Sequence, residues 1–66
     1  MIIDLSWAIE EWRTFEGDVR FSQSRDDLDR AKRARSVRRR AAGLTRAEYR
    51  FWIAVAEREL TKERAA

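Results

Sequence analysis

The first part of the chain carries hydrophobic residues at a helical spacing. Separations of three and four residues place them on an arc of about 120° when each residue turns the helix by about 100°. This stripe consists of Leu5, Ala8, Ile9, Trp12 and Phe15. The pattern predicts an amphipathic helix over about 4–16, with Asp4 or Ser6 as its N-cap and Gly17 as its stop.

A second helix is marked by signals at both ends. Ser24 followed by Asp27 resembles a capping box in which aspartate replaces glutamate. Gly43 is placed to take a left-handed conformation after the last turn, where Arg38–Arg40 suit the negative end of the helix. These signals predict a helix over about 25–42.

A complete Thr-x-x-Glu capping box precedes the last apolar run. Thr45 and Glu48 have the spacing at which each side chain bonds the backbone N–H of the other, which predicts a third helix over about 46–62. Its apolar arc of about 200° is wider than one neighbouring helix covers, so this helix either packs on both other helices or leaves part of the face for a partner. The arc is formed by Tyr49, Phe51, Trp52, Ile53, Val55, Ala56 and Leu60.

The segment between the first two helices has no helical period. Val19 and Phe21 alternate with polar residues in the manner of a very short strand. We interpret residues 17–23 as a connector that places Phe21 in the core.

Together these elements predict an all-α fold, with one small three-helix domain over residues 1–66. The middle helix offers mostly small residues for packing, so it covers little of the wide apolar arc of the third helix. These residues are Leu28, Ala31, Ala34, Val37 and Ala41. We therefore expect self-association as a homodimer, which would bury the surplus apolar face.

Composition excludes most catalytic chemistry. The chain has no cysteine and no histidine, which excludes disulfides, thiol nucleophiles, imidazole bases and the usual zinc sites. We expect a protein that is not an enzyme and that needs no metal, cofactor or small-molecule substrate. No apolar run approaches the roughly 20 residues that cross a bilayer, so we predict a cytoplasmic protein without membrane contact.

Charge is segregated along the chain. Lys and Arg total 15 against 12 Asp and Glu, for a net charge of +3, but residues 1–29 carry −5 and residues 30–40 carry +7 without any acidic residue. On a helix, five cations of this basic block share an arc of about 160° around Ser36, opposite the small apolar residues. These five are Lys32, Arg33, Arg35, Arg39 and Arg40.

The basic block predicts nucleic-acid binding. Cations at this density neutralise several phosphates and release counterions, and a helix fits the major groove of B-DNA. We predict a DNA-binding regulator or architectural factor, with RNA left open as the ligand. The predicted contact residues are Arg30, Lys32, Arg33, Arg35, Ser36, Arg38, Arg39 and Arg40.

Two alternatives use other contacts. In one, the basic block pairs with carboxylates of its own helix or of the hydrophilic face of the first helix. The pairs expected within the helix are Asp26 with Arg30 and Asp29 with Arg33, and the acidic residues of the first helix are Glu10, Glu11 and Glu16. In the other, the protein is a modulator that docks an aromatic and acidic helical surface on a larger assembly; a purely structural oligomer subunit is a further possibility. The candidate contacts for such a protein interface are Trp7, Tyr49 and Trp52.

Overall fold

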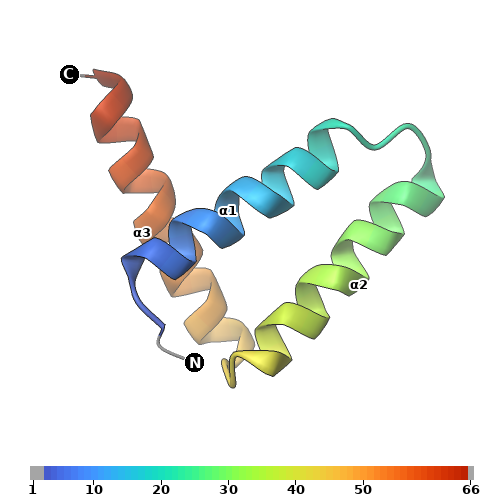
Figure 1. The fold of residues 1–66 in the computed structure, drawn as a ribbon, viewed down its shortest axis with the longest axis horizontal. Coiled ribbons are helices and arrows are strands. Elements are labelled where there is room, and N and C mark those ends of the chain that lie inside the picture. Colours follow the sequence, from blue (N-terminus) through green and yellow to red (C-terminus); the bar gives the residue numbers. More distant parts are fainter. Residues whose placement is uncertain (1–2, 66) are drawn as a thin grey trace.

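Three helices make up the fold: α1 over Leu5–Arg20, α2 over Arg25–Ala41 and α3 over Arg46–Ala65 (Figure 1). The computed structural model describes residues 3–65, and no strand occurs among them. α2 and α3 meet at the turn that joins them and diverge from it, while α1 lies across the opening and packs against both. The predicted all-α three-helix fold is confirmed.

Short polar residues start the first two helices. Asp4 is the N-cap of α1, where its carboxylate accepts a hydrogen bond from the Trp7 N–H at 3.0 Å. Ser24 is the N-cap of α2, and its hydroxyl accepts from the Asp27 N–H at 3.1 Å. The Asp27 carboxylate accepts in turn from the N–H of Gln23 at 3.2 Å. These bonds satisfy donors that the first helical turn leaves without backbone partners.

The turn between α2 and α3 is fixed by Gly43. Its φ of 74° is the left-handed conformation that commonly ends a helix and that glycine adopts without steric cost. The N–H of Gly43 donates to the Arg40 carbonyl at 3.0 Å, and the N–H of Leu44 donates to the Arg39 carbonyl at 3.1 Å. These are the two bonds of a Schellman motif, and Leu44 is buried next to them. The predicted stop at Gly43 is therefore confirmed.

α3 begins with the capping box that the sequence contains. The Glu48 N–H donates to the Thr45 hydroxyl at 3.1 Å, and the Thr45 N–H donates to the Glu48 carboxylate at 2.9 Å. The backbone N–H of Thr45, assisted by its side chain, lowers the pKa of Glu48 below its ordinary value. This reciprocal bonding fixes the start of α3 beside the end of α2.

Two predictions about residues 17–23 are wrong. Gly17 does not end α1, which continues to Arg20, and Val19 lies in this helix rather than in a strand. One glycine inside a helix costs about 1 kcal/mol, too little to stop a helix that gains further hydrogen bonds. The added turn makes Phe21 the C-cap residue, where its N–H donates to the Gly17 carbonyl at 3.0 Å. Phe21 is consequently 79% exposed instead of lying in the core.

Small side chains occupy the most enclosed positions of the core. Ala8 of α1 and Ala56 of α3 are both 0% exposed, and none of the large side chains described is enclosed to the same degree. Short side chains allow two helix axes to approach closely. The other buried apolar residues are Ala31, Leu44, Tyr49 and Leu60.

The wide apolar arc of α3 is divided between core and surface. Tyr49 and Leu60 are buried, whereas Phe51 is 59% exposed. Phe51 stands edge-on to Trp52, with ring centroids 5.5 Å apart. α3 packs mainly on α1, so one side of its arc has no cover within the part of the chain that the structure describes.

α2 turns a different face to the core from the predicted one. Ala31 is buried, but Val37 is 60% exposed and Ala41 is exposed as well. Arg35 and Arg38 point toward α1 and α3 instead. The guanidinium of Arg35 lies over the Phe15 ring of α1, and that of Arg38 bonds Glu11 of α1, so these two side chains take the inward positions. The predicted packing face is therefore wrong in the C-terminal half of α2.

Candidate functional site

A buried carboxylate joins all three helices. Glu11 of α1 is 5% exposed. The single Nε–H of Arg38 in α2 is shared between the two carboxylate oxygens of Glu11, at 3.0 and 2.8 Å, and the Tyr49 hydroxyl in α3 donates to one of them at 2.6 Å. The helical pattern predicts an exposed, hydrophilic position for Glu11, and this prediction is wrong. A charged side chain can be buried when polar partners bind it, and Arg38 and Tyr49 are such partners for Glu11. The Glu11–Arg38 pair agrees with the alternative in which the basic block pairs with carboxylates of the first helix, but it involves one arginine of the block.

Tyr49 is a core residue. It is 6% exposed, and Trp7 stands edge-on to its ring with centroids 6.3 Å apart. Burial raises the pKa of the Tyr49 hydroxyl above its ordinary value, and the hydrogen bond to Glu11 and its negative charge raise it further. The charges of Arg35 and Arg38 act in the opposite direction. Trp7 and Tyr49, both predicted as contacts for a protein partner, are thus packed against each other, Tyr49 buried and Trp7 half-buried.

Ionisation of Tyr49 is expected to accompany unfolding at alkaline pH. Because the fold favours the neutral phenol, its contribution to stability is complete below the ordinary pKa of about 10 and is lost as the pH rises toward the raised value. Tyr49 is the one tyrosine of the chain, so tyrosinate absorbance reports this residue alone. We expect phenolate formation to coincide with the loss of helical circular dichroism, above about pH 10.

A Tyr49→Phe variant provides the control for this titration. The variant is expected to lose less stability than the wild type as the pH rises above about 10, because it has no buried phenol to ionise. Phenolate formation near pH 10 in a protein that keeps its helical signal would contradict the coupling.

Two arginines of α2 are held by aromatic rings or a backbone carbonyl rather than by a carboxylate. The guanidinium carbon of Arg35 lies 4.4 Å from the centroid of the Phe15 ring and 5.9 Å from that of Tyr49. A cation over a ring face is attracted electrostatically, and its in-plane N–H groups stay available to a ligand. Nη1 of Arg39 donates to the Leu44 carbonyl at 2.8 Å. Both guanidinium groups are therefore held in place before any ligand arrives.

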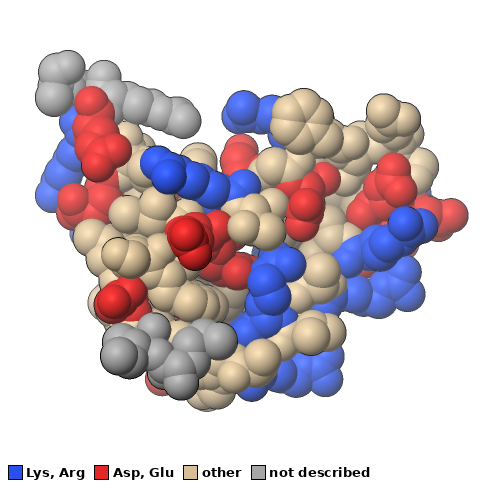
Figure 2. All heavy atoms as spheres, viewed as in Figure 1, with Lys and Arg blue, Asp and Glu red and all other residues tan. Residues whose placement is uncertain are grey.

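The outward side of α2 carries cations that lack carboxylate partners. Arg38 is the one member of the basic block that forms a salt bridge among residues 3–63, whose side chains the structure describes. The predicted pairs of Asp26 with Arg30 and of Asp29 with Arg33 are not formed. We call the exposed members of the block the outer cations: Arg30, Lys32, Arg33 and Arg40. Basic side chains gather along this side of the molecule in Figure 2.

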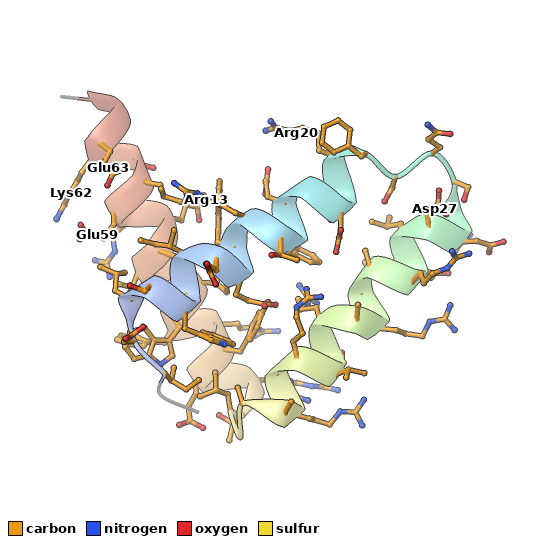
Figure 3. All side chains as sticks on the ribbon, in the orientation of Figure 1. Arg13, Arg20, Asp27, Glu59, Lys62 and Glu63 are labelled. Carbon is orange, nitrogen blue, oxygen red and sulfur yellow. The ribbon has the colours of Figure 1, made fainter. Side chains whose placement is uncertain are left out.

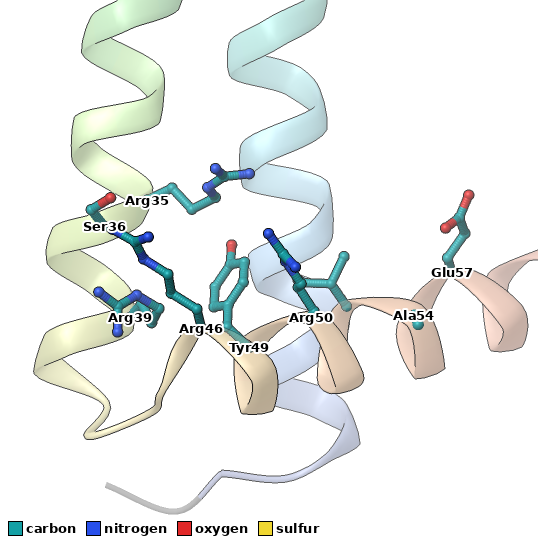
Figure 4. Close-up of a pocket in the computed structure, with 9 residues that line it drawn as sticks. Arg35, Ser36, Arg39, Arg46, Tyr49, Arg50, Ala54 and Glu57 are labelled. Carbon is teal, nitrogen blue, oxygen red and sulfur yellow. The ribbon is translucent and has the colours of Figure 1, made fainter.

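A groove between α2 and α3 brings arginines of both helices together. It has a volume of about 440 Å³ and is called here the arginine groove (Figure 4). Its arginines are Arg35 and Arg39 of α2 and Arg46 and Arg50 of α3. The ring of Tyr49 lies between the two helices at the base of the groove. The other lining residues are Ser36, Ile53, Ala54 and Glu57.

The charge pattern of the sequence does not identify Arg46 and Arg50. Both lie outside the basic block, in a segment from 41 to 66 whose net charge is only +1. They join the arginines of α2 because the turn at Gly43 returns the chain beside the end of α2. Their four-residue spacing directly after the capping box is the one local sign that they share a face of α3.

The structure distributes the predicted nucleic-acid contacts over three environments. The outer cations are exposed, Arg35, Ser36 and Arg39 line the arginine groove, and Arg38 is bound to Glu11. Trp52, the third predicted protein contact, is half-buried beside Phe51 on α3.

The described part of the chain offers neither a metal site of grouped acidic side chains nor a membrane-spanning helix. No three or more acidic side chains are grouped there so as to hold a metal ion. None of the helices described combines the length and the apolar content needed to cross a membrane.

Comparison with known proteins identifies no relative of this chain. No protein-family model matches the chain, and neither the curated proteins nor the solved structures contain a match. The side chains of this chain must therefore carry any functional proposal.

Proposed function

We propose that the protein binds nucleic acid through a continuous basic surface formed by α2 and the start of α3. The observation that carries the proposal is the meeting of cations from both helices around one groove, next to the outer cations of α2. Within the described side chains, only Arg38 of the basic block is neutralised by a carboxylate. A polyanion is the ligand that such a surface fits best.

The contact is expected to involve the C-terminal half of α2. Asp26 and Asp29 are exposed in its first turns, where their charges repel phosphate. Arg33 and Arg40 lie seven residues apart on the outward side, and Arg46 and Arg50 extend the surface onto α3. Each phosphate that these cations neutralise releases counterions and adds affinity that does not depend on sequence.

The role that fits this surface is regulatory or architectural. The exposed side of α2 is one helix wide, the width that enters the major groove of B-DNA. Arginines at the centre of the contact reach base edges, and those at its border bind the backbone. Binding alone accounts for these side chains, so the proposal includes no reaction.

The salt dependence of binding tests this proposal. Replacing Arg33 and Arg40 together by glutamine is expected to weaken binding to a generic duplex at about 50 mM salt and to reduce the slope of log K against log salt by about two. The measurement is fluorescence anisotropy with a labelled duplex over a salt series. No binding by the wild-type protein at this salt concentration would reject the proposal.

A matched control comes from the other end of α3. Arg58 and Lys62 are exposed, and Lys62 lies beside Glu59 and Glu63 at the far end of the helix (Figure 3). Replacing both by glutamine removes the same charge but is expected to leave the salt slope within about 0.5 of the wild-type value. A loss equal to that of the α2 variant would show that net charge alone, rather than this surface, determines binding.

A second candidate is contact with a protein through the outer face of α3. It is favoured by Phe51, which is 59% exposed and packed on Trp52. The same salt series separates the two functions, because contact through an apolar face persists at high salt and is insensitive to the α2 variants.

A further inference from the structure

The arginine groove differs from the outer side of α2 in shape and size. Its volume of about 440 Å³ lies in the range of about 300–1,000 Å³ typical of small-ligand clefts. A continuous duplex is therefore expected to contact the outer cations and the exposed Arg46 and Arg50 at the edge of the groove, but not to fill the groove itself. A single nucleotide unit, by contrast, matches its size.

One end of the groove is built for a phosphate. Arg46 and Arg50 of α3 lie opposite Arg35 of α2, around the ring of Tyr49 (Figure 4). Arg35 is stacked on Phe15 and therefore loses little conformational freedom when its N–H groups bind a ligand. Guanidinium groups bind phosphate oxygens through paired N–H donors, which makes them well suited to this ligand.

The other end of the groove is suited to a nucleoside. Ile53 and Ala54 give it an apolar wall, and Glu57 lies at the end away from Arg39 (Figure 4). The Glu57 carboxylate can accept hydrogen bonds from sugar hydroxyls or base amino groups. The same carboxylate repels a second phosphate, so the groove is unfavourable for a backbone that continues through it.

The charge of the groove favours a phosphate monoester. Four arginines and one glutamate leave its lining with a net charge of +3. A backbone phosphodiester carries one negative charge, whereas a terminal monoester carries about −1.5 to −2 at pH 7. The terminal group therefore neutralises more of the excess positive charge.

We infer that the arginine groove binds a nucleoside monophosphate unit, supplied by the phosphorylated end of a nucleic-acid strand. The inference deepens the proposed function and rests on it, because the outer cations supply general affinity and the groove adds selection for an end. A free nucleoside monophosphate has the same chemistry and is the other source to distinguish.

The test compares short single strands of one sequence that carry a 5′-phosphate, a 3′-phosphate or no terminal phosphate. The wild-type protein is expected to bind one phosphorylated strand about tenfold more tightly than the unphosphorylated one, the gain that one added charge-assisted contact supplies. Replacing Arg46 and Arg50 together by glutamine is expected to abolish this ratio. The Arg33→Gln and Arg40→Gln double variant should weaken all strands and keep the ratio.

Adenosine monophosphate and inorganic phosphate are the competitors that identify the source. Displacement of the phosphorylated strand by the nucleotide at lower concentration than by phosphate supports a nucleoside monophosphate site. Equal displacement by phosphate alone overturns it, because the apolar wall and Glu57 then contribute nothing. If the free nucleotide binds as tightly as the strand, the assignment to a strand end is wrong.

Failure of the inference can be told from failure of the proposed function. Equal affinity for all three strands, with salt-dependent binding intact, overturns the groove assignment alone. The absence of binding to any strand or duplex overturns both. The substituted arginines are exposed at the surface, and an unchanged circular dichroism spectrum will show that each variant is folded.

Discussion

Replacing Glu11 by leucine is expected to lower the free energy of unfolding by about 3 kcal/mol, because removing one partner of a buried pair leaves the other charge uncompensated. The Arg38 side chain is 31% exposed, so the pair is only partly buried and the loss lies at the lower end of the range for buried pairs. The Tyr49 hydroxyl loses its acceptor in the same variant. Urea denaturation followed by tryptophan fluorescence measures the change.

This loss is large for so small a protein. A domain of 66 residues has a total stability of about 3–10 kcal/mol. The neighbouring Glu10 is exposed, and a Glu10→Leu variant is expected to stay within about 0.5 kcal/mol of the wild type. Equal stability of the two variants would show that the network does not hold the helices together.

A rescue variant tests the reason for the loss. If the unpaired charge of Arg38 causes it, adding Arg38→Met to Glu11→Leu is expected to restore at least about 1 kcal/mol, since an apolar replacement of both partners is often neutral. A further loss in the double variant would mean that the arginine stem, rather than its charge, is what the core requires. The comparison separates electrostatic from packing contributions at this junction.

Local signals in the sequence predict the helix ends more reliably than the helix faces. The capping residues Ser24 and Thr45 and the stop at Gly43 act within four residues of themselves. Gly17 is the exception, because its weak helix-breaking effect competes with the hydrogen bonds of a further turn. Which of these two effects is larger cannot be predicted from the presence of a glycine alone.

The face that a helix buries depends on contacts between distant residues. The bonds from Arg38 and Tyr49 to Glu11 join positions 27 and 38 residues apart. They turn a charged residue of α1 inward, although its apolar stripe predicts a solvent-facing position. The same contacts turn Val37 of α2 outward. Hydrophobic periodicity predicts the existence of these helices but not their rotation.

The candidate site is predictable only in part for the same reason. The basic block identifies α2 as the charged helix, and the outer cations are exposed as the pattern indicates. The groove arises only when the turn at Gly43 places Arg46 and Arg50 beside α2. A net charge of +1 over residues 41–66 conceals this contribution.

Enlarging Ala56 to leucine is expected to destabilise the protein by about 2–3 kcal/mol, because added carbon atoms in an enclosed position force helices and side chains apart. Ala56 in α3 is 0% exposed, as is Ala8 in α1, the helix on which α3 mainly packs. The exposed Ala54 lies two residues earlier in α3. An Ala54→Leu variant makes the same chemical change and is expected to stay within about 0.5 kcal/mol of the wild type.

The Ala56→Leu variant also links the core to the arginine groove. α3 carries Arg46 and Arg50, whereas Arg35 rests on Phe15 of α1. A displacement of α3 from α1 therefore separates the arginines that face each other across the groove. At a temperature where the variant is still folded, we expect it to lose the preference for a phosphorylated strand end while keeping the salt-dependent affinity of the outer cations. A preference that survives a loss of 2 kcal/mol or more would show that the groove does not depend on the α1–α3 contact.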